Sequence, residues 1–122
     1  MVHSLAHPLS ARHGMHHGLA NALMLPDSMA FIEASDLTDE QQRRTAIIRS
    51  LFTEAGRAGD SLAAQTRSWV EELGIKFGLK RHGIPVNDIP ALADEAFLDT
   101  CHATNLIPVT RDDLAAVYEK AL

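Results

Sequence analysis

The sequence has little cysteine, no excess of positive charge and no long apolar run, and each absence excludes a class of protein. Its 122 residues include one cysteine, Cys101, so it forms no internal disulfide and suits a reducing compartment. The net charge of -5 argues against a nucleic-acid binder, which normally presents a basic face. No apolar run approaches the roughly 18 residues that a membrane span needs, and the first residues lack a signal-peptide pattern. We therefore expect a cytoplasmic protein without nucleic-acid or membrane partners.

Strand signals are equally scarce, because alternating runs of β-branched or aromatic residues are missing. Helix signals recur instead, and a chain of this length suits one domain with a modest core. We expect residues 1–122 to form a single helical domain, all-α, with five to seven helices. Pro26 should kink or divide the second of them. The clearest expected helices cover residues 3–12, 17–34, 39–56, 61–74, 89–98 and the stretch after Thr110.

Local signals mark where several of these helices begin. Thr38 followed three residues later by Gln41 is a capping-box pattern. Asp60 or Ser61 can cap the helix that follows, and Thr110 can cap the last one. Helical spacing then predicts which side chains form an apolar side or face inward. These are Ala46, Ile47, Leu51 and Phe52 in the third helix, Leu62, Trp69, Val70 and Leu73 in the fourth, and Leu114, Val117 and Tyr118 in the last.

Five of the seven histidines lie in the first 17 residues, in the stretch HSLAHPLSARHGMHH. His3 and His7 are spaced i, i+4, which on a helix places both imidazoles on one face, about 5–6 Å apart at Cβ. His17 lies beyond a helix break near Gly14, and a chain that folds back there could bring it to the same place. Three imidazoles suit Zn, Fe(II), Ni or Co better than Mg or Ca, which prefer oxygen ligands.

A structural interpretation of the same residues has to be weighed. An isolated HxxxH pair is weak evidence for a metal site, and HGLANALMLP alone is typical of an amphipathic core helix. The histidines outside the trio fit surface positions or polar networks better than ligand positions. They are His13, His16, His82 and His102.

The whole string HxxxHPLxxxxxxxHGxANAxxLP shifts that balance, since it resembles the signature of the iron-containing, metal-dependent alcohol dehydrogenases in residue type, order and spacing. The closing stretch CHATNLIPVTRDDLAAVYEKAL resembles more loosely the TNPR-like loop and short helix that end this family. The resemblance covers nearly the whole chain. It implies the helical C-terminal domain of these enzymes, whose fold is dehydroquinate synthase-like.

The resemblance also implies roles for individual residues. His3 and His17 correspond to metal ligands, and His7 corresponds to the residue near the nicotinamide and the reacting carbon. In the family a divalent metal polarises the alcohol oxygen while NAD(P) takes the hydride. The resemblance therefore implies iron as the cofactor, with zinc or nickel as alternatives.

Several departures from the family pattern are tolerable in a divergent member, whereas the parts that this sequence lacks limit what it can do. Ser10 stands where the family usually has Gly, His16 where it has Pro, and the stretch 104–107 reads TNLI, without the arginine. No Gly-rich phosphate loop occurs, so we do not expect NAD(P) to bind this chain alone. The family's two other ligands, an Asp and a His four residues later, belong upstream of His3.

Three hypotheses follow for a chain that resembles the C-terminal part of such an enzyme. It could supply half of a metal site, inactive alone, with a separate nucleotide-binding subunit supplying the rest. Alternatively it is a non-catalytic helical metal-binding or oligomerisation module, in which His13, His16 or a second copy completes the metal shell. A truncated gene product without a selected role is the third. The first two predict a homo-oligomer, most simply a dimer, because bared apolar surface is usually covered by association.

Overall fold

The structure, a computed structural model, describes residues 1–57 and 59–122. These residues form six α-helices and three short 3-10 helices, and contain no strand, which confirms the all-α prediction. None of the described helices has the length and apolar character needed to cross a membrane. The elements in chain order are α1 (Val2–His13), α2 (His17–Glu33), α3 (Asp39–Glu54), α4 (Leu62–Glu72), η1 (Leu79–His82), η2 (Val86–Asp88), α5 (Ile89–Leu98), η3 (Thr100–Thr104) and α6 (Arg111–Lys120).

The predicted helix starts are present in the structure. The Thr38 hydroxyl accepts from the backbone of Gln41, whose side chain returns a bond to the Thr38 N–H, and this completes a capping box. Thr110 begins α6 with a second capping box. Of the two candidates for α4, Ser61 is the cap, since its side chain accepts from the N–H of Ala64. Short-range side-chain chemistry therefore sets where these three helices start.

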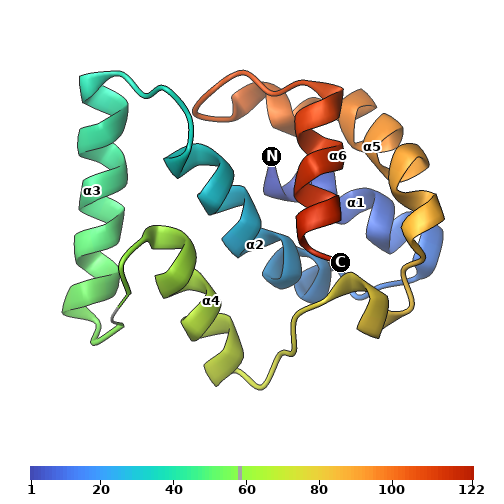
Figure 1. Ribbon diagram of the computed structural model, residues 1–122, viewed down its shortest axis with the longest axis horizontal. Coiled ribbons are helices and arrows are strands. Elements are labelled where there is room, and N and C mark those ends of the chain that lie inside the picture. The colour runs from blue at the N-terminus through green and yellow to red at the C-terminus, as the bar shows by residue number, and fades with distance from the viewer. Residues whose placement is uncertain (58) are drawn as a thin grey trace.

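The core lies where α1, α2, α5 and α6 meet (Figure 1). α2 runs unbroken through Pro26. Of the two predicted outcomes, a kink or a division of the helix, the division is therefore wrong. Leu114, Val117 and Tyr118 of α6 are buried, as predicted. The Tyr118 side chain is fully buried, and its hydroxyl donates to the backbone oxygen of Leu5 at 2.6 Å. This bond joins the C-terminal helix directly to the helix that carries His3 and His7.

α3 lies at the edge of the molecule, away from this core, and packs against α4 (Figure 1). No residue of α3 is buried, and Ile47 and Leu51 remain 60% and 57% exposed. The prediction that the whole apolar side of α4 faces inward was wrong for Leu73, which is 63% exposed, and only partly right for Trp69. A single neighbouring helix covers only part of an apolar side, and the remainder stays in contact with solvent.

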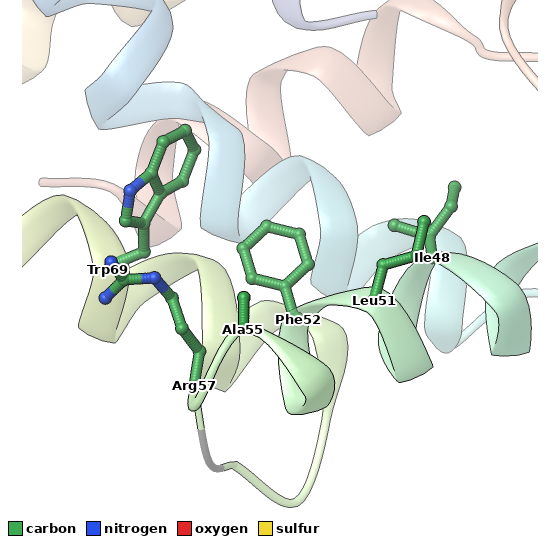
Figure 2. A pocket seen from close by; sticks show the side chains of 6 residues that line it. All are labelled: Ile48, Leu51, Phe52, Ala55, Arg57 and Trp69. Carbon is green, nitrogen blue, oxygen red and sulfur yellow. The ribbon is translucent and has the colours of Figure 1, made fainter.

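Between α3 and α4 this leaves an open apolar groove of about 330 Å³. Figure 2 shows the Phe52 ring beside the Trp69 indole, and the ring centroids are 5.9 Å apart in an edge-to-face arrangement. The groove is lined by Ile48, Leu51, Phe52, Ala55, Arg57 and Trp69.

Candidate metal centre

The first helix positions two of the three predicted site residues. His3 and His7 lie one turn apart on α1, and their ring centroids are 5.9 Å apart. Gly14 ends the helix with φ at 63°, a left-handed conformation that favours glycine, and its N–H bonds to the Ser10 oxygen. This turn reverses the chain, so that His17, the first residue of α2, returns to α1. Its ring centroid lies 5.5 Å from that of His3 and 5.2 Å from that of His7.

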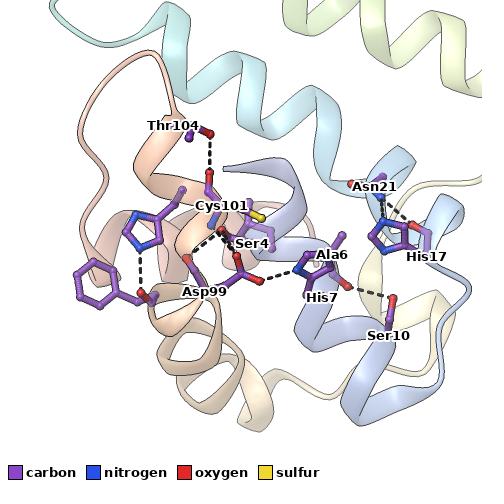
Figure 3. A network of polar contacts seen from close by, with 12 residues as sticks. Ser4, Ala6, His7, Ser10, His17, Asn21, Asp99, Cys101 and Thr104 are labelled. Atoms are coloured by element: carbon purple, nitrogen blue, oxygen red, sulfur yellow. Dashed lines mark hydrogen bonds and ion pairs between the residues drawn. The ribbon is translucent and has the colours of Figure 1, made fainter.

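His17 is held by a residue one turn further along α2. The Asn21 Nδ2 lies 2.9 Å from His17 Nε2 and donates to the His17 backbone oxygen at 3.0 Å (Figure 3). Because an amide NH₂ group can only donate, Nε2 accepts this hydrogen bond, and a metal bound at Nε2 would have to displace the Asn21 amide. The Asn21 Oδ1 is buried and has no hydrogen-bond partner among the described residues. The amide therefore has capacity for one further donor.

His7 has a partner that the sequence did not reveal. Its Nδ1 lies 2.5 Å from Oδ2 of Asp99, a residue 92 positions away at the junction of α5 and η3. The other carboxylate oxygen accepts from the N–H of Cys101 at 2.7 Å and from the Ser4 hydroxyl at 3.3 Å. The hydrogen bond with His7, followed by the one from Cys101, lowers the pKa of Asp99 well below its usual range. The carboxyl is therefore ionised at neutral pH.

Cys101 lies beside this carboxylate. Its pKa is raised, chiefly by the hydrogen bond to Asp99 and secondarily by burial, so the thiol form is favoured. Within the described part of the chain, one group of three metal-ligating atoms lies within 4.8 Å, and it belongs to His7, Asp99 and Cys101. The three imidazoles of His3, His7 and His17 are neighbours by ring position. They would have to rotate about their side-chain bonds to present their nitrogens to one ion.

The four remaining histidines each have a polar neighbour, although His13 Nε2 makes no hydrogen bond with the described residues. The His16 ring accepts from the N–H of Gly18 and so caps the start of α2. The other three place Nε2 near an oxygen atom. These contacts are His13 with Asp88 Oδ2 at 3.2 Å, His82 with the Lys76 oxygen at 2.7 Å, and His102 with the Phe97 oxygen at 2.9 Å.

An apolar pocket of about 390 Å³ opens beside His3. Its walls come from α1, α2 and α4, and a charged group placed there would lose solvation without gaining a partner. The pocket therefore suits an apolar side chain or an alkyl group. It is lined by Val2, His3, Asn21, Ala22, Leu25, Trp69, Val70 and Leu73.

Residues 1–122 match the family described as the Fe-containing alcohol dehydrogenase family, C-terminal. The chain is 34% identical over 128 residues to lactaldehyde reductase of Escherichia coli (strain K12), covering 99% of this chain and 32% of the relative. It is 29% identical over 128 residues to NAD-dependent methanol dehydrogenase of Bacillus methanolicus, covering 100% of this chain and 32% of that one. Its fold is similar to the solved structure of an alcohol dehydrogenase from Oenococcus oeni. That likeness has a TM-score of 0.75 at 24% identity, over 99% of this chain and 32% of the other.

These findings confirm the resemblance that the histidine string carries. The chain spans 32% of the length of both curated relatives. The matched range is residues 1–122, so it includes Ser10 and His16, where this chain departs from the family pattern. The chain therefore belongs to the Fe-containing alcohol dehydrogenase family, and it corresponds to the helical C-terminal domain of that family.

Proposed function

We propose that this chain supplies part of the metal site of an NAD(P)-linked oxidoreductase that interconverts a small primary alcohol and its aldehyde. In this proposal His3 and His17 are metal ligands, and His7 lies beside the reacting carbon and the nicotinamide. The observation that carries it is the cluster of three imidazoles whose ring centroids lie 5.2–5.9 Å apart across the turn at Gly14. The family and the activities for which both relatives are named support the reaction class.

The donor set fits a divalent transition metal. Imidazole nitrogen is a good ligand for Fe(II), Zn and Ni, and neutral ligands leave the charge of the ion uncompensated. When bound, such an ion would polarise the alcohol oxygen, and the nicotinamide would accept the hydride. His3 and His17 provide two of the four or more ligands that these ions take. The rest of the shell would come from groups other than these two histidines.

We therefore expect no turnover by this chain unaided. The completing ligands and the nucleotide site would lie outside residues 1–122, which span only 32% of the length of lactaldehyde reductase. Two features near His3 support a covering segment: the apolar pocket and the Asn21 Oδ1, which has no hydrogen-bond partner among the described residues. A segment with an apolar face and one suitably placed hydrogen-bond donor would satisfy both.

A chimera tests this proposal. The N-terminal part of lactaldehyde reductase, up to the point where its match to this chain begins, would be joined to residues 1–122. We expect NAD(P)-linked oxidation of a small primary alcohol, lost when both ligands are removed by His3→Ala/His17→Ala. A double change of two distant histidines, His82→Ala/His102→Ala, is the matched control and should retain activity. A chimera that folds and binds nucleotide but shows no turnover would contradict the proposal.

The alternative function is a non-catalytic helical module that binds metal or forms oligomers. The exposed Ile47 and Leu51 of α3 and the exposed Leu73, directly after α4, favour self-association in either case. We expect a homo-oligomer, most simply a two-fold dimer. Light scattering at about 100 μM should show a mass above that of the monomer, reduced by Ile47→Ser/Leu51→Ser. A monodisperse monomer would argue against this assembly.

A further inference from the structure

Three groups of this chain hold the Asp99 carboxylate in place. Oδ1 accepts from the Cys101 N–H and from the Ser4 hydroxyl, while Oδ2 lies 2.5 Å from His7 Nδ1. Figure 3 shows the His7 side chain between Asp99 and His17. One ring nitrogen of His7 is thus bound to the carboxylate, while the ring stacks 5.2 Å from the His17 ring and lies edge-to-face 5.9 Å from the His3 ring, measured between centroids.

The protonation of this pair follows from chemistry. An ionised carboxylate has no proton to give and can only accept hydrogen bonds. The proton between the two residues therefore belongs to Nδ1 of His7, and in a neutral imidazole Nε2 must then be unprotonated. This is the opposite of the tautomer that predominates for a histidine free in water. Asp99 thereby decides which nitrogen of His7 is available.

The same atoms could in principle bind a metal together with Cys101, but the distances disfavour it. Ligands in a tetrahedral zinc site lie about 2.0–2.3 Å from the ion and hence about 3.3–3.8 Å from one another. The observed separation of 2.5 Å between His7 Nδ1 and Asp99 Oδ2 is that of a shared proton. The raised pKa of Cys101 also disfavours the thiolate, which is the ligand form. A hydrogen-bonded pair therefore accounts for this cluster.

We propose that Asp99 is a positioning residue that holds His7 in the Nδ1–H tautomer and so presents its Nε2 as a hydrogen-bond acceptor at the His3–His17 cluster. The inference rests on the proposed function for its consequence, because an unprotonated Nε2 can accept the hydrogen bond of an alcohol hydroxyl bound there. Carboxylates that orient an active-site imidazole in this way fix both ring orientation and tautomer.

The isosteric variant Asp99→Asn separates this role from a structural one. Asp99 also caps η3, and asparagine caps about as well as aspartate. If the variant side chain keeps the native orientation, its amide oxygen accepts from the Cys101 N–H and its amide nitrogen faces His7 Nδ1. Nδ1 must then become an acceptor, and the proton moves to Nε2. The cap survives while the tautomer switches.

The test is a two-bond ¹H–¹⁵N correlation spectrum of the imidazoles in the labelled, metal-free chain at about pH 8, where histidine is mostly neutral. We expect the Nδ1–H tautomer for His7 in the native chain and the Nε2–H tautomer in Asp99→Asn. Asp94→Asn, which removes an exposed α5 carboxylate paired with Arg111, is the matched control and should leave His7 unchanged.

Two results would overturn the proposal: an Nε2–H tautomer in the native chain, or an unchanged His7 in a folded Asp99→Asn. The native spectrum decides even if the variant fails to fold. In the chimera, Asp99→Asn should lower kcat at least about tenfold, with little change in the KM for nucleotide. An Nδ1–H tautomer in an inactive chimera would refute the proposed function while leaving the tautomer assignment intact, so the two failures are distinguishable.

Discussion

Tyr118→Phe tests how the site helix is held in the fold. The hydroxyl of Tyr118 donates to the Leu5 oxygen at 2.6 Å, in a side chain with no exposed surface, and Leu5 lies between His3 and His7 on α1. The substitution removes this one bond and leaves the ring packing in place. Its loss should lower the free energy of unfolding by about 1 kcal/mol, the usual net value for such a bond. As a helical carbonyl, Leu5 O still accepts from the amide four residues on, so the full cost of an unpaired group does not arise.

This loss can be converted to a melting temperature. With about 2.1 cal/mol/K of unfolding entropy per residue, a chain of this length should lose about 4 °C in Tm per kcal/mol. Urea denaturation followed by circular dichroism would measure the free energy directly, with an unchanged m-value showing that the unfolding transition is the same. Tyr118→Ala, which also empties the ring site, should cost about 3–5 kcal/mol. A Tyr118→Phe chain as stable as the native one would refute the reasoning that this bond holds α1.

Three further predictions concern the turn at Gly14, the caps of α3 and α6, and the loss of stability at low pH. Gly14→Ala should cost about 1 kcal/mol in urea denaturation because an alanine must adopt the left-handed φ of 63°, although no described atom beyond the two adjacent residues lies within 4 Å of the added Cβ. Thr110→Ala should lower the free energy of unfolding by about 1 kcal/mol because it removes the cap of α6. Thr38→Ala should lower it less, because α3 contributes no buried residue. Equal losses in the two variants would show that α3 is integral to the core. The pKa of Asp99 is lowered in the folded chain, so its contribution to stability is present above the unfolded pKa of about 3.9 and is lost as the pH falls toward the depressed folded value. The urea midpoint should therefore drop more steeply below about pH 4 in the native chain than in Asp99→Asn, and parallel curves would contradict the shift.

The parts of the fold that could be predicted from the sequence depend on short-range chemistry. Thr38 with Gln41 three residues later predicted the start of α3, and Thr110 as a cap predicted the start of α6; both helices begin with a capping box. The i, i+4 spacing of His3 and His7 predicted a shared helix face, and the glycine at position 14 predicted the break that returns His17. In each case the cause and its effect lie within a few residues of each other in the chain.

The parts that could not be predicted depend on long-range packing. Nothing near His7 in the sequence indicates Asp99, because the two residues are 92 positions apart and meet only when α5 packs on α1. The apolar pattern of α3 predicts a helix but not what covers it, and Ile47 and Leu51 remain exposed. Burial is a property of the neighbouring surface, which the helix's own sequence does not encode.

The metal content of the purified, untagged chimera tests the central claim most directly. Elemental mass spectrometry of the chimera and of its His3→Ala/His17→Ala variant, after equilibration with Fe(II), Zn or Ni and removal of unbound ions, measures whether these histidines bind metal. We predict bound metal in the chimera that is lost in the double variant and retained in His82→Ala/His102→Ala. Equal metal content in the chimera and its His3→Ala/His17→Ala variant, or none in either, would contradict the assignment of His3 and His17 as ligands.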